Sequence, residues 1–126
     1  MTRYGRKLLD HFQHPRNTGV LETPDAASTV SNPQCGDMTT LHLRVIDGRV
    51  AEMRWQTRGC SASIAASSAL SELATGLPLA EAAAIGRQTI AEALGGLAPA
   101  QLHSCMLAED ALRQAIADYE RRSGNV

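Results

Sequence analysis

The sequence predicts an α+β fold, in which a small antiparallel sheet of about three strands carries helices packed on one face. Two alternating stretches, 38–46 and 49–57, flank the pair Asp47-Gly48, which is typical of a tight hairpin turn. After residue 60 the apolar residues recur at helical spacing. Strands followed by helices are the pattern of an α+β domain. The hairpin residues expected to share one face are Leu41, Leu43 and Val45 on one strand and Ala51, Met53 and Trp55 on the other.

The elements before the hairpin are shorter. Apolar residues at helical spacing predict a first helix over 3–13, which Pro15 ends. Residues 14–27 are rich in turn-forming residues and are expected to form a loop. A short strand is expected over 28–32, which would complete a three-stranded sheet.

The rest of the chain is predicted to be helical. A helix is expected over 61–75, followed by two short helices over 79–86 and 88–94. The last helix, 104–122, has the clearest periodicity, and two arginines near its end complement the helix dipole. Its apolar stripe consists of Leu102, Cys105, Leu112, Ile116 and Tyr119.

Length and composition exclude several classes of protein. The 126 residues suit one globular domain over 1–126, with 44% apolar and 20% charged residues. Twelve basic and thirteen acidic residues give a net charge of −1, which argues against nucleic acid as the main partner. No apolar run is long enough for a membrane span, and the first fifteen residues lack the hydrophobic region of a signal peptide. We therefore expect a cytoplasmic protein.

Five residues of metal-ligand type stand at the ends of predicted elements. The three cysteines, an odd number in a chain without a secretion signal, argue against a disulfide framework. Together with a carboxylate and an imidazole, their thiols form a mixed set suited to Zn²⁺ or to iron with sulfide. The five residues are Cys35, Asp37, Cys60, His103 and Cys105.

Local context decides between chemistry and simple packing for these residues. Free cysteine is among the most buried residue types, so each cysteine taken alone is more typical of a core than of a site. Cys60 and Cys105, however, lie near expected helix N-termini, where free N–H groups stabilise a thiolate. Gly36 gives the turn freedom to aim Cys35 and Asp37 at one point. Their common position at element ends favours a site.

Four stretches of the sequence resemble the IscU/NifU family of iron–sulfur cluster assembly scaffolds. They extend over nearly the whole chain and occur in the family's order, which makes the resemblance specific. The matching residues are Tyr4 with Leu9-Asp10-His11-Phe12 through Pro15-Arg16-Asn17-x-Gly19, then Pro33-x-Cys35-Gly36-Asp37, Gly59-Cys60-Ser61-Ala62-Ser63-Ile64-Ala65-Ala66-Ser67-Ser68, and Leu107-Ala108-Glu109-Asp110-Ala111 through Ala115-Ile116-Ala117-Asp118-Tyr119.

The resemblance implies a scaffold or carrier, not an enzyme, with an IscU/SufE-like fold. It implies a transient [2Fe–2S] cluster, with Fe²⁺ as a component and Zn²⁺ bound at the same ligands in the isolated protein. A cysteine desulfurase would supply sulfur as persulfide, other donors would supply iron and electrons, and apoproteins would accept the cluster. By resemblance, the five residues named above are the ligands, and Cys105 is in addition a persulfide acceptor.

One departure from the family concerns the last cysteine. The family has adjacent His and Cys before the last helix, whereas this chain has His103-Ser104-Cys105, so that Ser104 stands in the cysteine position. One residue corresponds to about 100° around a helix. If the helix has begun at Ser104, Cys105 points away from Cys35 and Cys60. If the helix begins later, a flexible turn presents the Cys105 thiol to the site.

A second departure concerns chaperones. Part of the family carries Leu-Pro-Pro-Val-Lys before the histidine, a motif bound by a specialised Hsp70. Residues 97–101 read Leu-Ala-Pro-Ala-Gln here, so we do not carry that chaperone over as a partner.

Two other functions stay open. One is a SufU-like, zinc-dependent sulfur acceptor, although that branch has an insertion before the last cysteine and lacks the histidine that this chain keeps. The other is a divergent zinc-binding paralogue without assembly activity.

Overall fold

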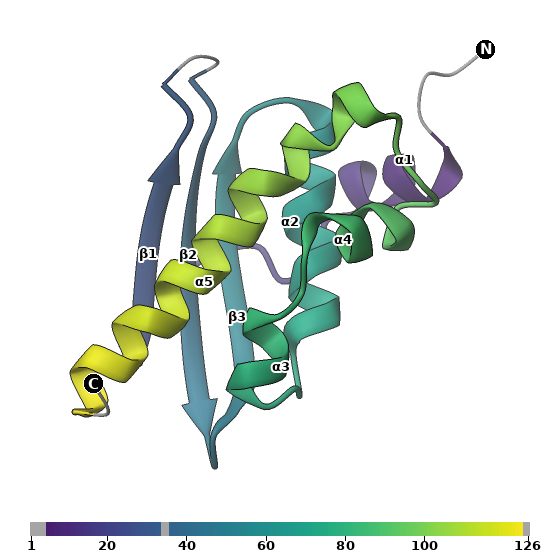
Figure 1. Cartoon of the computed structure of the whole chain (residues 1–126). Helices are drawn as coiled ribbons and strands as arrows, with labels where there is room; N and C mark the ends of the chain where they lie inside the picture. Colours follow the sequence, from purple (N-terminus) through teal and green to yellow (C-terminus); the bar gives the residue numbers. More distant parts are fainter. Residues whose placement is uncertain (1–4, 34–35, 125–126) are drawn as a thin grey trace.

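A computed structural model of the chain describes residues 5–33 and 36–124, and it confirms the predicted α+β class. The sheet is antiparallel in the order β1-β2-β3, and α5 crosses it diagonally, packed on β1 and β2 (Figure 1). Helix α2 packs on β3 and carries α1 on its other side. The elements are α1 (Arg6–Gln13), β1 (Ala26–Ser31), β2 (Met38–Ile46), β3 (Arg49–Arg58), α2 (Ser61–Ala74), α3 (Leu79–Ala83), α4 (Arg87–Ala93), the 3-10 helix η1 (Pro99–Gln101) and α5 (His103–Ser123).

The β2–β3 hairpin follows the predicted alternation, except beside its turn. Asp47 and the glycine after it both have positive φ, as a two-residue hairpin turn requires. The register then shifts between Arg44 and Val45, which is a β-bulge. Because the bulge changes which side chains face inward, Val50 is buried and Ala51 is exposed, contrary to the expected inward face.

Other boundaries differ from the expected ones for local reasons. Strand β1 begins inside the expected loop because Ala26 pairs with Leu43. The first short C-terminal helix is only α3, which ends at Ala83, and η1 was not expected at all. The start of α5 at His103, one residue earlier than expected, is the boundary with the largest consequence for the site.

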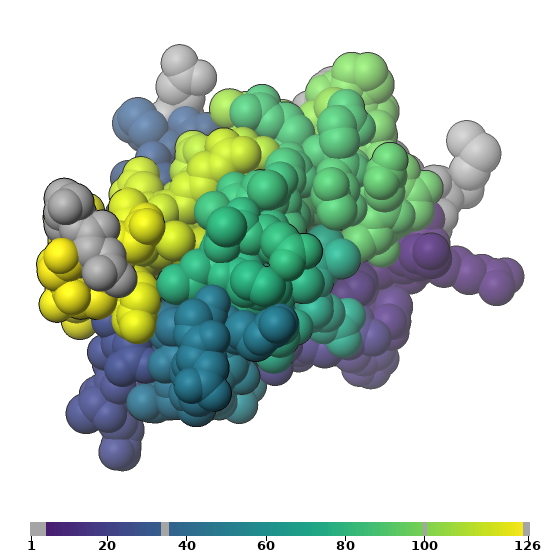
Figure 2. Space-filling view, turned by 60° about the horizontal axis from the view of Figure 1, so that its bottom comes forward, coloured from purple at the N-terminus to yellow at the C-terminus, as the bar shows by residue number. Residues whose placement is uncertain are grey.

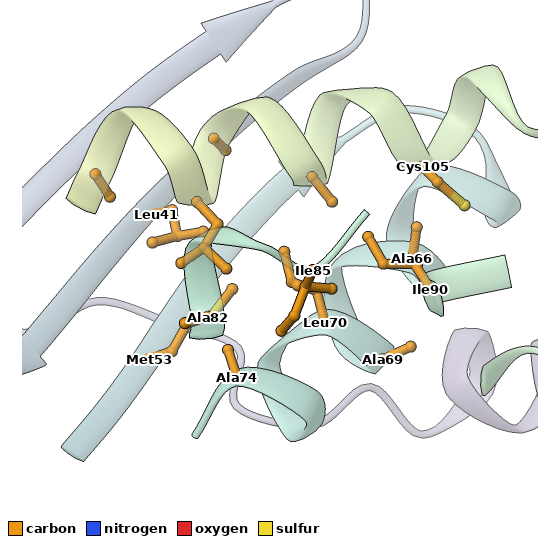
Figure 3. Packing of buried hydrophobic residues seen from close by; sticks show 14 of the residues in the cluster. Leu41, Met53, Ala66, Ala69, Leu70, Ala74, Ala82, Ile85, Ile90 and Cys105 are labelled. Atoms are coloured by element: carbon orange, nitrogen blue, oxygen red, sulfur yellow. The ribbon is translucent and has the colours of Figure 1, made fainter. Parts of the chain in front are cut away.

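The core lies between the sheet and the helices, and small residues on α2 let it pack closely. Ten of the 14 residues of α2 are buried, and all but one of these are alanine or serine. The buried face of α5 completes the same cluster (Figure 3). In the space-filling view the α3–α4 segment (green) lies against α5 (yellow) (Figure 2).

Within the described ranges, the structure has no helix that is long and apolar enough to cross a membrane.

Candidate functional site

Three loops meet at one end of the sheet, at the top of Figure 1. The β1–β2 loop brings Asp37 to the start of β2, the end of β3 leads through Gly59 and Cys60 into α2, and α5 begins beside them. Gly36 has φ 78°, a left-handed conformation that its lack of a side chain permits. Two backbone hydrogen bonds of Asn32, with Gly36 and with Asp37, close the loop at 2.8 Å each.

Ser63 joins the Cys60 thiol to the Asp37 carboxylate. Cys60 is the exposed N-cap residue of α2, and Ser63 lies three residues later, one turn along the helix. The Ser63 hydroxyl donates a hydrogen bond to Asp37 Oδ2 at 2.9 Å and lies 3.3 Å from Cys60 Sγ. Ser63 is only 3% exposed, so the hydroxyl that links the thiol to the carboxylate is buried.

The absence of a side chain at residue 59 makes room for the carboxylate. A Cβ built on Gly59 would lie 2.7 Å from Asp37 Cγ and 2.8 Å from Asp37 Oδ2, both closer than real Cβ atoms approach. Any larger residue at this position must therefore push the Asp37 side chain away from Ser63.

Ser104, and not Cys105, lies next to the Cys60 thiol. The Ser104 Oγ atom is 3.9 Å from Cys60 Sγ, within hydrogen-bond reach of a sulfur atom. Ser104 is 5% exposed. We refer to Asp37, Cys60, Ser63 and Ser104 together as the thiol–carboxylate cluster.

Cys105 lies in the hydrophobic core. Its exposed fraction is 0%, and its side chain is drawn among the buried residues that include Ala66 and Ile90 (Figure 3). Of the two orientations that the sequence left open, the structure shows the one in which α5 has already begun. The structure therefore places Cys105 in the core, and its role as a ligand and persulfide acceptor stays a prediction of the resemblance.

The environments of the two described cysteines shift their pKa values in opposite directions. Partial burial raises the pKa of Cys60, but hydrogen bonds from Ser63, Ser104 and the Ala62 backbone outweigh it, so the pKa lies below its usual value. Burial raises the pKa of the Cys105 thiol to about 11, and the charge of Glu109 adds to the effect. Cys60 is thus the described thiol that more readily becomes a nucleophile or a metal ligand.

His103 lies beside the cluster, on another side of the α5 N-terminus. Its exposed side chain lines a shallow pocket of about 180 Å³ together with Pro33 and Met106. The pocket borders the loop that carries Cys35, but Cys35 itself lies outside the described residues. The structure therefore brings Asp37 and Cys60 together, leaves His103 at the edge, and places Cys105 elsewhere.

The donors that are described fit a metal with mixed preferences. The exposed thiol of Cys60 is a soft ligand, and the carboxylate of Asp37, linked to it through Ser63, is a hard one. Both lie where the loops meet at the end of the sheet. Among residues 5–33 and 36–124, no group of three or more His, Cys, Asp or Glu side chains is arranged to hold a metal ion. A complete site thus needs a further ligand, and Cys35 is the adjacent thiol in the sequence.

Two members of the cluster were not expected from the sequence. Ser63 stands three residues after the N-cap, a position whose side chain faces the helix entrance, and this spacing could have revealed it. Ser104 could have been found from the apolar stripe of the last helix. If Cys105 belongs to the stripe that faces the core, the side chain of residue 104 points about 100° around the helix from that stripe.

Comparisons with known proteins agree with this fold. The family described as NifU-like N terminal domain matches residues 3–126. An iron–sulfur cluster assembly scaffold protein IscU of Archaeoglobus fulgidus is 48% identical over 123 residues, covering 98% of this chain and 80% of its own length. The IscU scaffold protein of Escherichia coli is 41% identical, covering 94% of this chain and 95% of its own.

A solved structure shows the same fold. The N-terminal part of a nitrogen-fixing NifU-like protein from Brucella abortus superposes with a TM-score of 0.77 at 24% identity, covering 94% of this chain and 95% of that one. The match of the family over nearly the whole chain and the high identity to two scaffold proteins agree with the sequence resemblance. The chain belongs to the NifU-like N terminal domain family.

Proposed function

We propose that this protein is a scaffold on which iron–sulfur clusters are assembled and from which they are transferred. The relatives named as IscU scaffolds support the assignment. The single observation that carries it is the link between the exposed Cys60 thiol and the Asp37 carboxylate through Ser63. This link brings a soft and a hard ligand from two loops to one accessible point.

The chemistry of the ligands suits a cargo that must leave again. Thiolates bind the iron atoms of a cluster firmly, whereas a carboxylate is a weaker match for a soft cluster. Asp37 therefore makes the site labile. Cys35, Asp37, Cys60 and His103 are the proposed ligands of a [2Fe–2S] cluster, and Zn²⁺ is expected to occupy the same ligands in isolated protein.

The role defines the partners. A cysteine desulfurase is the proposed source of sulfur, separate donors supply Fe²⁺ and electrons, and apoproteins accept the finished cluster. In this proposal the protein itself is a carrier, and it catalyses no net reaction.

Anaerobic reconstitution tests the proposal. The protein is incubated with ferrous iron, cysteine and a cysteine desulfurase, and visible absorption is recorded. We expect sulfide-to-iron charge-transfer bands that are lost in Cys60→Ser. The control is Ser123→Ala, at the opposite end of α5, which should retain the bands.

Transfer to an acceptor tests the role of the carboxylate. With Asp37→Ala, we expect the cluster to form and to leave more slowly, because a hard ligand has been removed from a soft site. A transfer rate equal to that of the unaltered protein would exclude this role for Asp37.

The same experiments separate the two other functions. Tightly bound zinc, no cluster and sulfur accepted from the desulfurase would indicate a zinc-dependent sulfur acceptor. Zinc that a chelator removes only on unfolding, without sulfur chemistry, would indicate a structural metal in a divergent paralogue.

A further inference from the structure

The first turn of α5 decides which side chain completes the site. The chain is helical before Ser104 is reached: η1 spans Pro99–Gln101, Leu102 has φ −61° and ψ −28°, and the backbone N–H of Cys105 bonds to the carbonyl of Leu102 at 2.9 Å. Side chains 104 and 105 therefore diverge by about 100°. A change of rotamer cannot exchange them.

Each of the two side chains is fixed by what surrounds it. Ser104 Oγ lies 3.9 Å from Cys60 Sγ, and Cys60 is tied through Ser63 to Asp37. Cys105 is 0% exposed, points about 100° around the helix from Ser104, and faces α2 and α4.

The helix is also anchored one turn further along. Glu109, four residues after Cys105 on the same buried side, accepts hydrogen bonds from the backbone N–H and the guanidinium of Arg87, and it pairs with Arg113. These contacts tie α5 to the start of α4 and hold its rotation. Turning Cys105 toward Cys60 would break them and would expose the core.

We propose that Ser104 is a positioning residue of the site, that its hydroxyl donates a hydrogen bond to the Cys60 sulfur, and that Cys105 supplies no thiol to the site. Cys105 is a core residue without a part in metal or sulfur binding. The inference rests on the proposed scaffold function and gives it a different ligand set from the one the sequence resemblance implies. A hydroxyl is neutral and hard, so it supports a thiolate without replacing one.

Cobalt(II) is the probe for the number of thiols at the site. It occupies zinc-type ligands, and the intensity of its thiolate charge-transfer absorption grows with the number of bound thiolates. We expect Cys105→Ala to leave this intensity unchanged and Cys60→Ser to lower it, because Cys60 is the described thiol beside Ser104 and Asp37. Ser104→Cys should raise it, because the new thiol would lie beside Cys60. Loss of intensity in Cys105→Ala, or no gain in Ser104→Cys, would overturn the proposal.

A crosslinking experiment checks the same geometry without any metal. In a Cys35→Ser background, the remaining cysteines Cys60 and Cys105 are exposed to diamide, which takes two electrons from a pair of thiols that can meet. We expect no intramolecular disulfide there, and efficient disulfide formation after the further changes Ser104→Cys and Cys105→Ala. Both are read by mass spectrometry. A disulfide between Cys60 and Cys105 in the folded protein would overturn the proposal.

Crosslinking and cluster reconstitution together separate this inference from the scaffold function. If the crosslinks form as expected but reconstitution yields no cluster, the scaffold function fails and the position of Ser104 is supported. If clusters form and Cys105→Ala abolishes them in folded protein, the exclusion of Cys105 from the site is overturned and the scaffold function remains.

Discussion

Cys60 and Cys105 each lie near the start of a long helix, at the same end of the sheet, and yet they have opposite environments. Cys60 precedes its helix and faces outward, with hydroxyl and backbone donors around its sulfur. Cys105 lies inside the first turn of its helix and faces the core. Proximity to a helix N-terminus therefore does not make a thiol reactive, because the direction in which the helix turns the side chain decides its access to solvent.

The two regions also depend on different forces. The thiol–carboxylate cluster is held by hydrogen bonds that two buried serine hydroxyls make with an exposed thiol and a partly exposed carboxylate, and changes there should affect ligand binding more than folding. The surroundings of Cys105 are apolar and closely packed, with Glu109 as a buried ionic anchor, and changes there should affect folding first.

The largest expected effect is the difference in thiol reactivity. At pH 8, iodoacetamide should modify Cys60 at least about 100-fold faster than Cys105, because a pKa near 11 leaves Cys105 almost wholly protonated and burial hinders access further. The rates are measured by peptide mass spectrometry on folded protein. In urea the difference should disappear. Comparable rates in the folded state would contradict the described orientation of α5.

The next largest effect concerns the anchor of α5. Glu109→Ala removes the acceptor for the Arg87 backbone N–H and the partner of two guanidinium groups, and should lower the free energy of unfolding by about 2 kcal/mol. Urea unfolding gives the value. Glu109→Gln is the matched control: its amide oxygen can still accept a hydrogen bond, so it should cost less. Equal stability of all three proteins would show that Glu109 is no anchor.

A smaller effect is expected on the Cys60 side. In Gly59→Ala the new methyl group displaces the Asp37 carboxylate, which should weaken Zn²⁺ binding about tenfold while changing stability by less than about 1 kcal/mol. A competition titration measures the affinity. Gly5→Ala is the matched control, since a Cβ there meets no atom within 4 Å. A larger loss of stability than of affinity would assign Gly59 to the fold and not to the site.

The smallest effect is a pH dependence of stability. The pKa of Cys105 is raised in the folded state, so its contribution is fully present below the unfolded pKa near 9 and is lost as the pH rises toward 11. Between pH 8 and pH 10 the protein should lose about 1 kcal/mol more stability than Cys105→Ala does. Urea unfolding of both proteins at the two pH values gives the difference. Parallel pH profiles would mean that the Cys105 thiol titrates normally.

Local sequence patterns predicted most of the fold. The alternation around Asp47-Gly48 defined the hairpin, because side-chain direction in a strand depends only on position along it. The bulge beside Val45 could not be predicted, since it arises from the fit between two strands. The 3-10 helix before α5 was missed for a related reason: a three-residue turn has too little periodicity to recognise.

The residues of the candidate site were also predicted only in part from local sequence patterns. Cysteine, aspartate and histidine at element ends indicated a site because these residue types carry ligand chemistry wherever they lie. The sequence stripe of the last helix already grouped Cys105 with Leu112 and Ile116, and both of these are buried in the structure. A pattern within one helix thus placed Cys105 with the core, even while the family resemblance placed it at the site.

The amino-acid sequence by itself determined the α+β class, the order of the strands and α-helices, the family and the apolar face of the last helix. These are local or compositional properties, and a periodic pattern records them directly. Only the tertiary structure decided that Ser104 meets Cys60, that Ser63 connects Cys60 to Asp37 and that Gly59 makes room for the carboxylate. Those contacts depend on the rotation of α5 against α2 and on the close approach of loops far apart in the sequence. Packing of the whole core, which no single segment encodes, sets both.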